Sequence, residues 1–225
     1  MAMRLVLVSL LMFGFLGFSQ SESLFDEANS AYQSGDYEAA VSKYESILAD
    51  GEASAALYFN LGNAHYKLNQ VAPSIYYYEK ALQLNPTDKD IQNNIAFARN
   101  MAIDDIEKIE ETGFSVWFNN VISSFSYSTW AILGIVFSIS FVLMFLLYYF
   151  SVRSLFKRLY FTGAIIFAIF CLLAVVFAFQ QQSYIQDNQF AIIFSEEVEV
   201  RDEPNLRGEA SFELHEGTKA RILED

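Results

Sequence analysis

The side chains best suited to chemistry are few in this sequence and widely spaced. Its two histidines, His65 and His215, lie far apart along the chain, and its single cysteine, Cys171, lies in an apolar run. Neither a metal-ligand cluster nor a nucleophile–base pair is recognisable. We interpret the acid pair Asp104-Asp105 as solvated helix surface. The sequence therefore predicts a protein that is not an enzyme, with no catalytic residues, no metal site and no cofactor.

Asparagine and aromatic side chains recur instead, in a pattern that suits peptide binding. An asparagine offers both a donor and an acceptor to an extended backbone, and aromatic rings supply apolar contact. Packing inside the protein is the competing role, which we expect for about half of them. The predicted peptide-binding residues are Phe25, Asn29, Tyr32, Phe59, Asn60, Asn63, Tyr66, Lys67, Asn94 and Phe97.

These residues belong to two copies of one pattern, 34 residues apart. That period is typical of a repeat made of two helices and a turn. Small residues in one helix would let the other approach closely, and bulky tyrosines would fill the space between repeats. The matched pairs include Phe25 with Phe59, Ala28 with Gly62, Asn29 with Asn63, Tyr32 with Tyr66, Tyr44 with Tyr78, and Leu48 with Leu82.

The turn between the two helices of each copy is also predictable. Gly35 and Asn69 stand at matching positions, and both residue types tolerate the left-handed conformation of a helix C-cap. Asp36 and Gln70 follow them and would open the second helix. Each copy is therefore predicted to be a helical hairpin.

The second copy resembles the tetratricopeptide repeat (TPR) consensus. The matching stretches are Asn60-Leu61-Gly62-Asn63-Ala64-His65-Tyr66, then Tyr78-Glu79-Lys80-Ala81-Leu82 and Pro86. The resemblance implies repeats at 21–54 and 55–88, with a concave peptide-binding face formed by the first helices, and puts His65 in a slot for a packing aromatic. A partial third copy loses the pattern after Met101, so we expect a capping helix at 89–110.

Two apolar runs follow the repeats. Helices of about 20 apolar residues can cross a bilayer, and the sequence predicts them at 128–150 and 159–179. The connection at 151–158 carries Arg153, Lys157 and Arg158, and positively charged loops stay in the cytoplasm. Both flanking parts are therefore expected outside the cytoplasm.

Residues 1–19 combine Arg4, an apolar run and small residues near Ser19, which indicates a secretory signal peptide. A retained signal anchor is the alternative. Residues 114–127 place Phe114, Trp117 and Phe118 on one side of a helix, which predicts an amphipathic helix at the membrane surface. The competing interpretation is an extension of the first membrane helix.

The last segment, 190–225, changes to strand periodicity. Val198 and Val200 alternate with polar residues, as do Phe212 and Leu214. The segment resembles the opening of a bacterial SH3-like domain, and we expect that barrel to be incomplete because about 36 residues are too few to close it. A truncated sequence, an alternative terminus or a partner strand would each account for this.

Charge limits the choice of partner. The net charge is −13, with −10 in residues 21–113 and −7 in residues 183–225. No basic patch is available outside the membrane, so nucleic-acid binding is not expected. An acidic groove favours neutral or basic peptide segments at close contact.

The complete order of segments resembles the BatE-type proteins of the bacterial aerotolerance operon. That resemblance implies a multi-pass protein of the bacterial inner membrane, with the repeats and the C-terminal segment in the periplasm. It also implies partners with von Willebrand A domains, a MoxR-type AAA+ ATPase system and a role in oxidative-stress tolerance. The predicted fold class is mainly α: TPR repeats and two membrane helices, with a short β segment. The predicted function is a membrane-anchored scaffold, and the alternative is an envelope sensor acting through the SH3-like segment.

Overall fold

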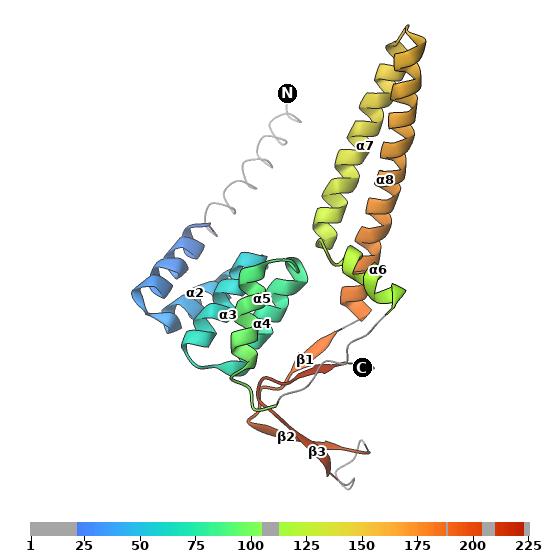
Figure 1. Ribbon diagram of the computed structural model, residues 1–225. Helices are drawn as coiled ribbons and strands as arrows, with labels where there is room; N and C mark the ends of the chain where they lie inside the picture. Colours follow the sequence, from blue (N-terminus) through green and yellow to red (C-terminus); the bar gives the residue numbers. More distant parts are fainter. Residues whose placement is uncertain (1–21, 105–112, 188, 204–209, 223–225) are drawn as a thin grey trace, which may run out of the picture. The chain divides into compact units, whose positions relative to one another are not determined.

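The computed structural model describes residues 22–104, 113–187, 189–203 and 210–222 (Figure 1). The chain divides into two compact units. One combines the repeat helices with Ala191–Ala220, and the other contains the long apolar helices. The predicted signal peptide lies outside the described residues. Helices dominate, with a few short strands near the C-terminus, so the predicted fold class is confirmed.

Five helices form the repeat region. The first spans residues 22–34, and it is followed by α2 (Tyr37–Ala49), α3 (Ala55–Lys67), α4 (Val71–Leu84) and α5 (Lys89–Arg99). Gly35 and Asn69 take φ angles of 85° and 60°, as expected for the left-handed turn inside each hairpin. The Asp36 side chain accepts a hydrogen bond from Ala39 N and caps α2.

Close helix packing explains the small residues of the pattern. A Cβ added to Gly62 would lie 2.6 Å from Tyr78 Cδ1, so the ring occupies the space that a side chain would need. Tyr44 is fully buried in a cluster with Ala28, Leu57 and Leu61, which come from both repeats. The tyrosines therefore fill the space inside each hairpin as well as the space between repeats.

The helix of the third copy is shorter than the predicted capping helix at 89–110. Helix α5 ends at Arg99, and Asn100 is its C-cap. Met101 N and Ala102 N then bond to carbonyls three residues back, at Ala98 and Arg99. Such tight turns close a helix end. Residues 105–110 lie outside the described part of the chain.

The C-terminal segment forms four short strands: β1 (Phe190–Ile192), β2 (Glu197–Arg201), β3 (Ala210–His215) and β4 (Lys219–Arg221). Strands β2 and β3 pair antiparallel, with Val198 opposite Leu214 and an irregularity after Val200. Strand β1 pairs with β4. Within the described residues these are two separate two-stranded sheets, so the strand prediction is confirmed whereas the SH3-like barrel remains a prediction.

The second unit contains α6 (Phe114–Ile122), α7 (Tyr127–Phe150) and α8 (Ser154–Asp187). Helices α7 and α8 lie side by side (Figure 1), and both are long and apolar enough to cross a membrane. Helix α6 is separate from α7, because the chain turns at residues 123–126 and Ser126 caps α7. Trp130 Nε1 donates to Ile122 O across this turn at 2.8 Å.

The apolar runs do not mark the helix ends. Helix α8 begins at Ser154 and continues to Asp187, so Lys157 and Arg158 lie on the helix and not in a loop of 151–158. The physical reason is that hydropathy marks only the part of a helix suited to hydrocarbon. Backbone hydrogen bonds, such as Lys157 N to Arg153 O, continue the helix into polar surroundings.

Candidate functional site

A cavity opens between the first helices of successive repeats. It has a volume of about 230 Å³ and combines amide, aromatic and ammonium groups. Its wall comes from the helix at 22–34, from α3 and from α5, with one residue from α4. The lining residues are Tyr32, Asn63, Tyr66, Lys67, Tyr78, Asn94 and Phe97.

Two equivalent hydrogen-bond triplets link the helices of the repeats, and the second of them lies in the wall of this cavity. In the first, Tyr44 Oη donates to Asn29 Oδ1 at 2.6 Å, and Asn60 Nδ2 donates to the same oxygen at 2.9 Å. Asn29 and Tyr44 belong to one repeat and Asn60 to the next. The triplet therefore links neighbouring repeats through a single carbonyl oxygen.

The second triplet repeats this arrangement one copy later. Tyr78 Oη donates to Asn63 Oδ1 at 2.7 Å, and Asn94 Nδ2 donates to it at 2.8 Å. Burial raises the pKa of Tyr44 to about 12 and also raises the pKa of Tyr78, so both hydroxyls stay protonated and donate at neutral pH. The Oδ1 atoms of Asn29 and Asn63 thus serve the fold, and a ligand would meet the amide nitrogen of Asn63.

Comparison with known families agrees with this geometry. Residues 25–89 match a family model described as Tetratricopeptide repeat. These two hairpins are TPR repeats. The TPR is typically a non-catalytic fold for protein interaction. No curated protein matches the chain.

The TPR cavity gathers six of the ten predicted binding residues: Tyr32, Asn63, Tyr66, Lys67, Asn94 and Phe97. The other four serve contacts between TPR helices. Phe25 and Phe59 pack on Tyr44 and Tyr78, with ring centroids 5.7 and 6.0 Å apart. Asn29 and Asn60 belong to the first triplet. Sequence reasoning missed Tyr78, because its match with Tyr44 indicated a core residue and not a cavity wall.

His65 packs within the TPR core. Only 7% of its surface is exposed, and its ring stacks on Tyr77 with centroids 5.3 Å apart. Its Nδ1 lies 2.5 Å from Gln70 Oε1. Burial lowers the pKa of His65, so the ring is neutral at pH 7 and Nδ1 donates to the amide oxygen. The described residues also contain no group of three or more side chains that could hold a metal.

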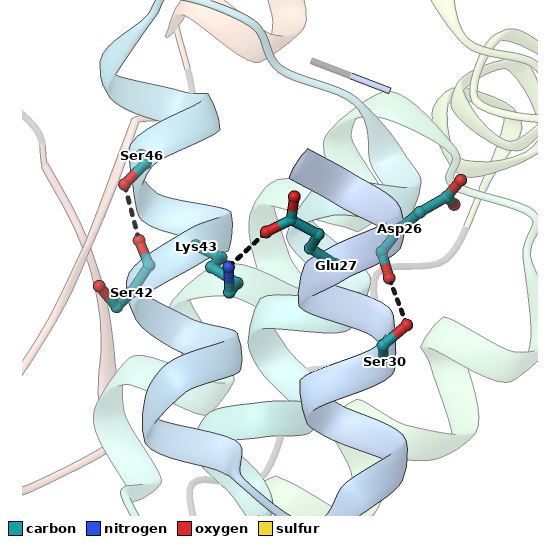
Figure 2. Close-up of polar contacts among 6 residues, drawn as sticks. All are labelled: Asp26, Glu27, Ser30, Ser42, Lys43 and Ser46. Atoms are coloured by element: carbon teal, nitrogen blue, oxygen red, sulfur yellow. Dashed lines mark hydrogen bonds and ion pairs between the residues drawn. The ribbon is translucent and has the colours of Figure 1, made fainter. Parts of the chain in front are cut away.

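The outer surface of the first TPR repeat carries solvated polar contacts (Figure 2). Lys43 Nζ lies 2.6 Å from Glu27 Oε2, and the Glu27 side chain is exposed whereas that of Lys43 is partly exposed. Ser30 and Ser46 donate to carbonyls four residues back in their own helices. Exposed ion pairs contribute little to stability. None of the residues in these contacts lines the cavity. This surface is not a candidate site.

Asp104 was predicted to be solvated helix surface, and that prediction is wrong. Its Oδ1 lies 2.7 Å from His215 Nδ1, and its Oδ2 accepts from Thr218 Oγ1 at 2.5 Å. The sequence gives no sign of this contact because the partners are more than a hundred residues away. The cluster is not a catalytic triad either, because Thr218 donates to the carboxylate and not to the imidazole.

Proposed function

We propose that the chain is a non-enzymatic, membrane-anchored TPR scaffold that binds an extended segment of a partner protein in the cavity. The observation that carries the proposal is a cavity shared by three successive first helices. A peptide lying across them would meet Asn63 and Asn94 as hydrogen-bond donors. Phe97, which is 59% exposed, would supply apolar contact.

The same arrangement indicates the chemistry of the bound segment. Because Asn63 Oδ1 already accepts two hydrogen bonds, the groove offers more donors than acceptors, which suits the carbonyls of an extended backbone. Lys67 adds one cation at the rim of the cavity. The acidic charge of the repeat region favours neutral or basic residues on either side of the bound stretch.

The two apolar helices support an anchor in a bacterial inner membrane. Arg153, Lys157 and Arg158 at the α7–α8 connection support a cytoplasmic location for that end, and the repeats would then face the periplasm. A cleaved signal peptide agrees with this orientation. By resemblance to BatE-type proteins, the partners would be membrane proteins with von Willebrand A domains in a MoxR-linked system for oxidative-stress tolerance.

A matched pair of phenylalanines tests the groove. Phe97 lines the cavity and Phe212 lies on β3, and the two are nearly equally exposed at 59% and 56%. We would screen the detergent-solubilised chain against an array of neutral and basic peptides, then repeat the screen with Phe97→Ala and Phe212→Ala. Binding that falls by about tenfold only in Phe97→Ala supports the proposal.

Equal binding by Phe97→Ala and the unchanged chain would overturn the groove assignment. A loss confined to Phe212→Ala would move the binding surface to the C-terminal strands and favour the envelope sensor. Asn63→Ala is a poorer probe, because it would also remove the acceptor of Tyr78 and disturb the fold.

A further inference from the structure

The repeat register continues beyond the second hairpin. Asp36, Gln70 and Asp104 fall at equivalent positions, 34 residues apart, each just after the turn that ends a first helix. In the first repeat this position caps the second helix, since Asp36 Oδ1 accepts from Ala39 N at 3.1 Å. Asp104 accepts its hydrogen bonds from a different part of the chain.

The donors to Asp104 come from the turn between β3 and β4. His215 N donates to Oδ2 at 2.7 Å, beside the contacts from the His215 ring and the Thr218 hydroxyl. Thr218 is only 4% exposed. These bonds lower the pKa of Asp104 to about 2, the Thr218 bond having the largest effect, and keep it a carboxylate. Asp104 therefore acts for this turn as a capping residue acts for a helix.

The turn also packs tightly against α4, in addition to its hydrogen bonds. Gly217 has a φ of 88°, and a Cβ added there would lie 2.9 Å from Val71 Cγ1 and 3.0 Å from Ile75 Cδ1. The turn thus reaches the surface of α4 with no room for a side chain. Gly217 N also donates to Ile193 O at 2.9 Å, and Ile193 N donates to Thr218 O at 3.0 Å, which holds the turn in shape.

Two carboxylates, those of Glu216 and Glu79, extend the attachment to α4 and α5. Glu216 Oε1 accepts from Ala72 N at 3.1 Å, in the first turn of α4, where backbone donors lack helical partners. Glu79 of α4, whose side chain is 7% exposed, accepts from Arg99 of α5 and from Lys219 of β4. A single carboxylate therefore joins α4, α5 and the C-terminal segment.

We propose that the His215–Thr218 turn is a clamp that stands in the place of the second helix of the third repeat and holds α5 against α4. A first helix at the end of a repeat stack needs a neighbour to cover it. The clamp meets that need with residues from the other end of the chain. Through it, the C-terminal segment supports Asn94 and Phe97, which α5 contributes to the groove.

The effect on the groove rests on the proposed function, whereas the clamp itself does not. The test is therefore amide hydrogen exchange, read by mass spectrometry on the intact chain in detergent. Asp104→Ala is compared with Asp36→Ala, the same substitution at the equivalent position of the first repeat. We expect exchange in α5 to rise by about tenfold in Asp104→Ala, and exchange in α2 to rise in Asp36→Ala.

Gly217→Ala is a second route to the same state, because its Cβ would push the turn away from Val71 and Ile75. It should speed exchange in α5 as Asp104→Ala does, and leave the helix at 22–34 protected. Unchanged exchange of α5 in both variants would overturn the clamp, as would an equal rise in every repeat helix. If the unchanged chain binds no peptide while both variants still speed exchange in α5, the clamp stands and the groove assignment fails.

Discussion

The two TPR repeats share the tyrosine–asparagine contact of their interior, but one pair of equivalent glutamates differs in burial. Glu45 of α2 and Glu79 of α4 are 34 residues apart, at the same position of the repeat. Glu45 is exposed, whereas Glu79, taken as a whole residue, has only 5% of its surface exposed. The Glu79 carboxylate forms ion pairs with Arg99 and with Lys219 of β4. Arg99 stands at the position that His65 occupies in the preceding repeat.

This difference shows that position in the stack decides what a repeat residue does. Inside the hairpins the same tyrosine and asparagine atoms meet at nearly the same distances, 2.6 and 2.7 Å. At the end of the stack, the equivalent glutamate, Glu79, instead binds Lys219 from the distant C-terminal segment. In the first repeat, the ion pair on the outer side joins Lys43 and Glu27, which lie only 16 residues apart.

Truncation of the two glutamates should give the largest contrast. Glu79→Ala removes the acceptor of two charged donors, and hydrogen bonds to charged groups contribute about 1.5–3 kcal/mol. Arg99 and Lys219 are partly exposed and can regain water, so we expect a loss of about 2 kcal/mol. Glu45→Ala removes one hydrogen bond, from the Tyr77 hydroxyl to an exposed carboxylate, so we expect a loss of about 0.5–1 kcal/mol. Urea unfolding of the solubilised chain, followed by circular dichroism, measures both, and equal losses would refute the contrast.

Gly62→Ala should have the next largest effect. Alanine stands at the matching position, Ala28, in the first repeat, but the added Cβ at residue 62 would press on the Tyr78 ring. Overpacking costs about 1–3 kcal/mol, and the gain in helix propensity returns about 1 kcal/mol. We expect a net loss of up to about 2 kcal/mol in the same unfolding measurement. A stabilised Gly62→Ala variant would mean that α3 and α4 can separate without cost.

Removal of the tyrosine hydroxyls should affect both repeats alike. Tyr44→Phe and Tyr78→Phe each delete one hydrogen bond, while the asparagine oxygen keeps its second donor from Asn60 or Asn94. Each variant should therefore lose about 1 kcal/mol. A difference greater than about 1 kcal/mol between the two would show that the triplets are not equivalent. Thermal melts by circular dichroism compare them directly.

Acid should release the clamp, with an effect that is absent at neutral pH. The folded state lowers the pKa of Asp104 to about 2, so its contribution to stability is complete above the unfolded value of about 3.9 and is lost as the pH falls toward 2. Hydrogen exchange in α5 at matched intrinsic rates should rise between pH 4 and pH 2. In Asp104→Asn the rise over this window should be smaller, since no carboxylate titrates at that position.

The interior of the repeats was predictable because it depends on local sequence. The period of 34, the turn at Gly35 and Asn69 and the cap at Asp36 follow from residue type and spacing. Six predicted groove residues line one cavity for the same reason, since the repeat register places them on successive first helices.

The clamp was not predictable, since it joins Asp104 to His215 and Glu79 to Lys219 across more than a hundred residues. Nothing in the local pattern distinguishes Glu79 from Glu45. The ends of α8 were missed for another reason, because hydropathy marks a membrane span and does not mark where backbone hydrogen bonding stops.

Site-specific photo-crosslinking tests the groove most directly. A benzophenone amino acid replaces Phe97 in one preparation and Phe212 in another, and each is irradiated with the best peptide from the array. We predict adducts at position 97, with mass spectrometry placing the peptide next to α3 and α5, and none at position 212. Adducts at position 212 without adducts at position 97 would contradict a binding site in the TPR groove.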